Sequence, residues 1–212
     1  NGNRAVGATF GEDPGDPDQD GFSNYEELII HGTDPDNPDT DGDGVSDGTD
    51  VFPLDSSEDS DADGDGIGNN ADPDDDNDGI NDEAEGPLGT DPLLADTDGD
   101  GLGDGDEIRY SYDPTNPDSN GDGTPDGLDD SDEDELTAVQ EIAAGTSPRQ
   151  ADTDGDGIDD SDELNTHGTD PTMADTDGDL LRDGVELTLT GTDPLLADTD
   201  GNGTSDGDED PD

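Results

Sequence analysis

Acidic side chains recur in this sequence at the spacing of ligands around a metal ion. Residues 152–163 read DTDGDGIDDSDE. Carboxylates stand at positions 1, 3, 5, 9 and 12 of this segment, which are Asp152, Asp154, Asp156, Asp160 and Glu163. Calcium takes six to eight oxygen ligands, and EF-hand loops supply them from positions 1, 3, 5, 7 (a carbonyl), 9 (often through water) and 12. Gly157 at position 6 permits the sharp turn between them. The segment therefore predicts a calcium-binding loop.

The same block of alternating acids begins ten times along the chain. The starting residues are Asp16, Asp39, Asp61, Asp74, Asp96, Asp118, Asp130, Asp152, Asp175 and Asp198. The steps between them are 22–23 residues or 12–13 residues. A random acidic sequence would not keep two fixed spacings, so the blocks are structural repeats.

The ten loops differ in quality. Five match the full pattern with glutamate last, and these are 16–27, 74–85, 96–107, 152–163 and 198–209. Three end in aspartate, whose shorter arm predicts a looser contact, and these are 39–50, 61–72 and 118–129. Two are degraded: loop 130–141 has Glu135 at position 6 and Ala138 at position 9, and loop 175–186 has Leu180 at position 6. We expect weaker or distorted sites in these two.

The predicted ligands follow from the loop positions. Position 1 is the starting aspartate of each loop. Positions 3 and 5 are Asp18, Asp20, Asp41, Asp43, Asp63, Asp65, Asp76, Asp78, Asp98, Asp100, Asn120, Asp122, Asp132, Asp134, Asp154, Asp156, Asp177, Asp179, Asp200 and Asn202. Position 7 offers the carbonyls of Phe22, Val45, Ile67, Ile80, Leu102, Thr124, Leu136, Ile158, Leu181 and Thr204. Position 9 is Asn24, Asp47, Asn69, Asp82, Asp104, Asp126, Asp160, Asp183 and Asp206. Position 12 is Glu27, Asp50, Asp72, Glu85, Glu107, Asp129, Glu141, Glu163, Glu186 and Glu209.

The composition requires such neutralisation if the chain is to fold. The 212 residues carry 67 acids, four arginines and no lysine, for a formal charge of −63. Only 22% of residues are hydrophobic, which without cations is the composition of a disordered chain. Ten calcium ions would reduce the charge to −43, and about twenty, with carboxylates bridging neighbouring ions, would reduce it to −23. We expect between ten and twenty ions.

The composition also excludes several classes of function. Nucleic acid is not expected as a partner, because phosphate contacts need a basic face. The longest aliphatic run is residues 28–30, so we expect no membrane span. The opening NGNRAVGATF lacks the basic start and apolar stretch of a signal peptide, which does not argue against export. No apolar pocket can form to raise the pKa of a general acid, so we expect no enzyme.

Short helical turns are predicted after the loops. Ser23 and Glu26 have capping-box spacing, and Gly32 suits the helix end. The turn motif GTDP follows at 32–35 and recurs at 89–92, 168–171 and 191–194. Its aspartate is either a further ligand or a turn residue. The best helix of the chain is expected over residues 134–144.

Apolar residues occur in register, and we expect them to form one small hydrophobic cluster per repeat. They stand at position 7 and, as Leu28, Val51, Ile108, Ile142, Leu164 and Leu187, directly after position 12. His31 and His167 occupy equivalent places before GTDP and are interpreted as residues at helix ends rather than ligands.

The chain resembles the thrombospondin type 3 repeats in their cysteine-free bacterial form. The segments that carry the resemblance are DTDGDG at 96–101 and 152–157, GTDPLLADTDGDG at 89–101 and DADGDGIGNNADPDDDNDGI at 61–80. The resemblance covers roughly residues 13–212 and implies an irregular, calcium-stabilised repeat array with little regular secondary structure, in secreted or cell-surface proteins. Residues 1–12 are a separate, non-repeat segment. RTX repeats have the wrong period, and dockerins use this loop only as a pair.

A linear calcium-dependent array suggests a mechanical function. Extracellular modules bind calcium with dissociation constants of about 0.1–1 mM. At about 1 mM calcium and a dissociation constant of about 0.1 mM, each site stabilises the ordered form by about 1.4 kcal/mol, and at cytosolic calcium by almost nothing. We therefore expect an extracellular stalk, spacer or filament segment of a bacterial surface or secreted protein, joined to other domains or to like subunits. The alternatives are an adhesion module that binds a receptor, polysaccharide or mineral through calcium, and a low-affinity calcium store.

Overall fold

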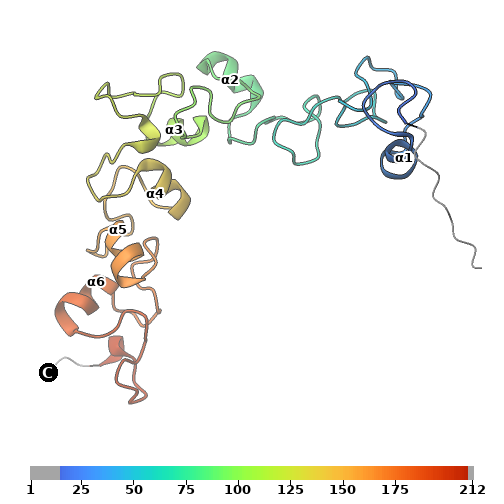
Figure 1. The fold of residues 1–212 in the computed structure, drawn as a ribbon. Coiled ribbons are helices and arrows are strands. Elements are labelled where there is room, and N and C mark those ends of the chain that lie inside the picture. Colours follow the sequence, from blue (N-terminus) through green and yellow to red (C-terminus); the bar gives the residue numbers. More distant parts are fainter. Residues whose placement is uncertain (1–14, 210–212) are drawn as a thin grey trace, which may run out of the picture. The chain divides into compact units, whose positions relative to one another are not determined.

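The computed structural model describes residues 15–209, and over these residues the chain forms short helices and turns without a β-strand (Figure 1). The segment 1–12 lies outside the described residues. The α-helical elements are α1 (Asn24–Glu26), α2 (Asp82–Leu88), α3 (Asp104–Tyr110), α4 (Ala138–Ala144), α5 (Asp160–Asp162) and α6 (Asp183–Val185). The π- and 3₁₀-helical turns are η1 (Glu27–His31), η2 (Asp126–Leu128), η3 (Glu163–His167), η4 (Glu186–Thr190) and η5 (Asp206–Asp208). The predicted irregular repeat array is confirmed.

The described residues form two compact units, which divide between Leu94 and Ala95. The first unit contains α1, η1 and α2, and the second contains α3 to η5. No helix among residues 15–209 is long and apolar enough to cross a membrane.

The predicted helical turn after the first loop begins and ends where the sequence indicates. Ser23 caps α1: the Ser23 N–H donates to Glu26 Oε2 at 2.9 Å, and the Glu26 N–H donates to Ser23 Oγ at 3.4 Å. Gly32 ends η1 in the left-handed conformation, with φ of 83°. His31 and His167 are the last residues of η1 and η3, as interpreted from the sequence.

The helix predicted over residues 134–144 is shorter than expected, because its first residues belong to the preceding loop. The helix α4 begins at Ala138, with Thr137 as its N-cap. The N–H of Leu136 donates to Asp134 Oδ1 at 2.7 Å, which holds that amide outside the helix. Glu135 has φ of 83°, a left-handed conformation that an α-helix cannot include.

The hydrophobic core is small. Leu102 and Ala138, 2% and 0% exposed, pack with Tyr112 in the second unit, and Tyr110 and Ile142 contact this cluster. Leu136 and Ile158, at position 7 of their loops, are also buried as predicted.

The prediction of one apolar cluster per repeat was wrong for several residues. Ile67 at position 7 is exposed, and so are five of the residues after position 12, which are Leu28, Val51, Ile108, Leu164 and Leu187. In most of these repeats the acid at position 12 is the buried residue. The inward face of the helical turn is thus occupied by a carboxylate rather than by an aliphatic side chain.

Consecutive loops are joined by one recurring contact. The backbone N–H at position 10 of one loop donates to Oδ2 of the aspartate at position 5 of the preceding loop. The four pairs are Gly127 with Asp100 (3.0 Å), Ser161 with Asp134 (3.2 Å), Gly184 with Asp156 (2.7 Å) and Gly207 with Asp179 (2.8 Å). The same two loop positions approach each other in the first unit, where a Cβ at Gly48 would lie 2.4 Å from the carbonyl oxygen of Asp20.

Candidate metal sites

Each of the ten loops turns through two left-handed residues, at positions 4 and 6. Position 4 has positive φ in every loop and is Gly42, Gly64, Gly99, Gly121, Gly155, Gly178, Gly201, Gln19, Asn77 or Glu133. Position 6 does too, and is glycine in eight loops. The left-handed residue at position 6 was predicted from the sequence, whereas that at position 4 was not, although the repeated DGDG was a signal for both.

The aspartate at position 1 holds this turn. In loop 96–107 the N–H groups of Gly99 and Gly101 donate to Asp96 Oδ1 and Oδ2, at 2.8 and 2.9 Å. In the loop without the glycine, the Leu180 N–H still donates to Asp175 Oδ2, at 3.0 Å. The backbone of loops 130–141 and 175–186 is therefore not distorted and adopts the common path with a left-handed non-glycine residue. The weaker metal binding expected there stays a prediction.

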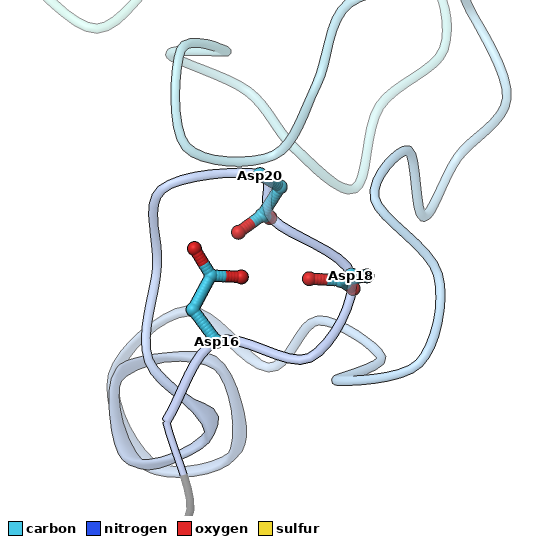
Figure 2. A group of neighbouring side chains, drawn as sticks. All are labelled: Asp16, Asp18 and Asp20. Atoms are coloured by element: carbon cyan, nitrogen blue, oxygen red, sulfur yellow. The ribbon is translucent and has the colours of Figure 1, made fainter.

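The first three acids of a loop point their carboxylates into its interior. Figure 2 shows Asp16, Asp18 and Asp20 directed toward one another inside one turn of the chain. One carboxylate oxygen of each lies within 4.8 Å of the others. The same grouping occurs in loops 39–50, 61–72 and 74–85.

The acid at position 12 enters the same space from the helical turn. Six of these glutamates are 0% exposed: Glu27, Glu85, Glu107, Glu141, Glu163 and Glu186. Both carboxylate oxygens of the first four, and Oε2 of the last two, have no hydrogen-bond partner. Buried polar groups are nearly always hydrogen-bonded, and a repeated set of unpartnered carboxylates is a donor set that a cation would satisfy.

The pKa values of these glutamates also show that their negative charge is poorly stabilised by the protein alone. Burial raises the pKa of Glu107 to about 9, and the charges of Asp98 and Asp100 add to the shift. Burial and the same kind of repulsion raise the pKa of Glu141 to about 8 and that of Glu163 to about 7. Burial also raises the pKa of Asp98, to about 6. Either protons or a bound cation must neutralise such clusters at neutral pH.

Position 9 closes the loop through hydrogen bonds. In loop 152–163 the N–H and hydroxyl of Thr153 donate to the two carboxylate oxygens of Asp160, at 2.9 and 2.7 Å. Four other loops use the same threonine at position 2, and these pairs are Thr40 with Asp47, Thr97 with Asp104, Thr176 with Asp183 and Thr199 with Asp206. The threonine could have been found in the sequence from its constant spacing of seven residues before the aspartate. The predicted ligand role of position 9 stays a prediction, and one carboxylate oxygen of Asp47 lies within 4.8 Å of those of Asp20 and Glu27.

The turn motif GTDP supports the loops without adding carboxylates to them. In four of these turns the aspartate side chain accepts the N–H two residues further on, as in Asp170 with Thr172 at 3.0 Å. This is the behaviour of a turn residue. The threonine of the motif has a second contact: the Thr169 hydroxyl donates to Glu163 Oε1 at 2.9 Å and so orients the position-12 carboxylate.

Four loops do not bury a glutamate at position 12. Glu209 is exposed and accepts a hydrogen bond from Asn202 Nδ2 at 2.5 Å, although its loop matches the full sequence pattern. Asp50 is buried, whereas Asp72 and Asp129 are partly exposed. An α- or π-helical turn therefore accompanies each buried position-12 glutamate, whereas loops 118–129 and 198–209 close in the 3₁₀ turns η2 and η5.

The donor set fits a hard divalent cation. The groups that converge in each loop are carboxylate oxygens, several of them buried and without partners, and the sequence has no cysteine. Oxygen-only sets of this kind suit calcium, magnesium or manganese.

Comparison with known families agrees with this geometry. The model of the family described as "Bacterial TSP3 repeat" matches residues 16–38, 74–95, 96–117, 152–174 and 175–197, which together are more than half of the chain. The chain belongs to the bacterial thrombospondin type 3 repeat family. Each matched TSP3 segment begins with a loop whose position-12 glutamate is buried.

Two solved structures share sequence with part of this TSP3 chain. One is "Biofilm associated protein - BSP domain", with 41% identity and a TM-score of 0.21 over 21% of this chain and 8% of that one. The other is "Biofilm associated protein - B domain", with 40% identity and a TM-score of 0.21 over 21% of this chain and 11% of that one. The chain thus matches about a tenth of the length of either protein. A comparison with curated proteins finds no match.

Proposed function

We propose that this chain is a calcium-binding structural repeat region, with residues 13–212 as the repeat array. The observation that carries the proposal is the set of six fully buried position-12 glutamates, each with one or both carboxylate oxygens without a hydrogen-bond partner. Each faces the acids at positions 3 and 5 of its own loop, as Glu107 faces Asp98 and Asp100. Removing three like charges from water is unfavourable unless a cation is held among them.

The proposed ligands are the side chains at positions 1, 3, 5 and 12 and the carbonyl at position 7. Position 9 is assigned to closing the loop wherever it accepts both donors of a threonine, as Asp160 does from Thr153. Calcium suits this arrangement better than magnesium, because it accepts six to eight oxygens in flexible geometry whereas magnesium demands near-ideal octahedral ligands. About ten ions are proposed, with further ions where loops adjoin.

The proposed setting is extracellular, in a bacterial surface or secreted protein. Sites with dissociation constants of about 0.1–1 mM fill at extracellular calcium and stay empty at cytosolic calcium. The chain carries a formal charge of −63 and has a small core, so its ordered state would depend on the external cation. Family membership favours this setting, and other domains of a larger protein are the proposed neighbours.

The proposed function is mechanical, as a calcium-rigidified spacer or filament segment. Within the second unit, each contact between a position-5 aspartate and the next position-10 amide joins one repeat to the following one. A chain in which each repeat contacts its neighbours is quasi-one-dimensional, and its stiffness depends on those contacts. A catalytic role is not proposed, because the buried acids lie in repeated loops rather than beside one substrate pocket.

The proposal is tested by amide proton–nitrogen NMR spectra in EGTA, in magnesium and in about 2 mM calcium. Dispersed peaks in calcium alone are expected, because specific cages order the backbone whereas a polyacid merely condenses cations. Collapsed and matching spectra in all three conditions would show that the loops form no cages. Ion counting alone would not separate these results, since any polyacid collects divalent ions.

A further inference from the structure

Loop 74–85 departs from the other loops at position 2. Five loops carry a threonine there, whose hydroxyl donates to the position-9 aspartate. Here the residue is Asp75, which still donates its N–H to Asp82 Oδ1 at 3.0 Å. Its carboxylate places a like charge where the hydroxyl proton would be. Aspartate at this position loses the hydrogen bond from the hydroxyl and repels the carboxylate of Asp82. Another interaction must therefore stabilise the Asp75 carboxylate.

The Asp75 side chain is buried and incompletely partnered. It is 8% exposed, and its Oδ1 has no hydrogen-bond partner. Burial raises its pKa, and the charges that add to the shift are those of Asp82, Asp72, Asp76 and Asp63. Two of these four carboxylates, Asp63 and Asp72, belong to the preceding loop. Charged groups of both loops therefore act on Asp75.

The two loops are held close enough to share a ligand. Only Pro73 separates them in the sequence. The side-chain amide of Asn77 contacts the Asp63 carboxylate across the junction, and the Asp74 N–H donates to Asp72 Oδ1 at 3.0 Å. The sequence has no basic residue between His31 and Arg109, so no side chain of this unit near the junction can neutralise Asp75.

Of these two adjoining loops, loop 61–72 has the weaker position-12 ligand. Its position-12 residue is Asp72, which is partly exposed and has one oxygen occupied by the Asp74 N–H. A glutamate at this position reaches further and can bind calcium through both oxygens. At position 9, the Asn69 side-chain oxygen accepts the Ala62 N–H at 2.9 Å and so closes the backbone of the loop. The position-12 carboxylate of this cage is therefore shorter and less buried than those of the loops that bury a glutamate.

We propose that Asp75 crosses the junction to bind the cation of loop 61–72, beside Asp63 and Asp72, and replaces the bidentate acid that this loop lacks. The inference rests on the proposed function, because it adds a ligand to one of the proposed cages. It makes the pair of closely spaced loops one binding unit, whose first ion requires a side chain of the second loop.

The test is a calcium titration of the full chain carrying Asp75→Thr, followed by NMR. Threonine is the residue of five other loops at this position and restores the hydroxyl for Asp82, so the variant is expected to keep loop 74–85 folded. The Gly66 amide reports on loop 61–72 because it donates to Asp61 Oδ2 at 3.1 Å, and the Gly44 amide reports likewise on loop 39–50. Asp75→Thr should raise the calcium midpoint at Gly66 about tenfold or more and leave Gly44 unchanged.

Three further variants complete the design. Asp36→Thr removes an exposed carboxylate of the same unit and should change neither midpoint. Asp75→Asn, nearly isosteric, should raise the Gly66 midpoint even if Asp75→Thr disturbs the loop. Asp72→Glu supplies the longer acid within loop 61–72 and should restore the Gly66 midpoint in the Asp75→Thr background.

The outcomes separate this inference from the proposed function. If neither Gly44 nor Gly66 responds to calcium in the wild-type chain, the cages themselves fail and the inference fails with them. If both respond but Asp75→Thr and Asp75→Asn leave Gly66 as Asp36→Thr does, Asp75 is not a ligand and only the inference is overturned. The same conclusion follows if Asp72→Glu does not rescue the midpoint.

Discussion

Replacing Gly184 by alanine should weaken the contact between the repeats that begin at Asp152 and Asp175. A Cβ at Gly184 would lie 2.4 Å from the carbonyl oxygen of Asp156, where ordinary contacts begin near 3.4 Å. The backbones would have to separate by about 1 Å, and overpacking of this kind typically costs about 1–3 kcal/mol. The movement would also stretch the hydrogen bond from the Gly184 N–H to Asp156 Oδ2, now 2.7 Å.

Another loop already carries a side chain at this position. Ser161 occupies the same loop position with a Cβ present, and its N–H still donates to Asp134 Oδ2, at 3.2 Å. The contact should therefore lengthen in Gly184→Ala rather than disappear, and the variant should remain folded in calcium.

Amide hydrogen exchange in about 2 mM calcium measures the effect at the contact itself. A loss of about 1–3 kcal/mol corresponds to about 5- to 150-fold faster exchange at residue 184, with the Gly127 amide of an earlier repeat unchanged. Gly86→Ala is the matched control, because Gly86 lies within α2 and a Cβ there meets no heavy atom within 4 Å. Unchanged protection at residue 184, equal to that in Gly86→Ala, would refute the close packing of these loops.

Three other predictions concern single loops. Glu107→Gln should weaken calcium binding in its loop about tenfold or more, measured by titration of the Gly101 amide, because it removes a fully buried charged ligand. Thr153→Val should destabilise the calcium-bound form by about 1–3 kcal/mol in thermal unfolding, because it leaves an oxygen of buried Asp160 without a donor, while Thr→Val at exposed Thr166 should have little effect. Leu180→Gly should stabilise the calcium-bound form by about 1 kcal/mol by relieving a φ of 85°, and Leu180→Ala, which keeps the strain, should not.

Acidification should favour order when calcium is absent. The pKa of Glu107 is raised from 4.5 to about 9, first by burial, and that of Glu141 to about 8. Between pH 4.5 and these values the ordered state binds more protons than the unfolded state, so its stability falls as pH rises through this window. In EGTA, amide dispersion should therefore increase from pH 8 toward pH 5. In calcium the dependence should reverse, because the ligands must lose their protons to bind.

Much of the local structure could be predicted from the sequence because it depends on residues a few positions apart. The capping box of Ser23 and Glu26, the stop at Gly32 and the turn at position 6 each follow from local backbone chemistry. The start of the helix α4 could not be predicted in this way. Asp134 and Glu135 precede residues that favour a helix, but hydrogen bonds within the preceding loop hold this segment in a non-helical conformation.

The buried surface was harder to predict than the turns. Aliphatic residues such as Leu28 and Leu164 stand where an amphipathic helix would bury them, yet they are exposed and the neighbouring Glu27 and Glu163 are buried. Hydropathy ranks these residues in the opposite order, because it assumes that charge prefers water. The ranking fails where acids gather around a cation, so the loop spacing was a better guide to burial than side-chain polarity.

The contact between repeats links the cation sites to the array. The two carboxylate oxygens of Asp156 bind different loops. Oδ1 accepts the Ile158 N–H of its own loop at 2.8 Å, and Oδ2 accepts the Gly184 N–H of the next loop at 2.7 Å. A cation held by Asp156 would fix the side chain on which the next repeat docks. Gly184 directly follows Asp183, whose carboxylate closes the following loop, so docking also restrains that aspartate. Order should therefore pass from one loop to the next, and loops in contact should fill with calcium more cooperatively than loops that lack this pair.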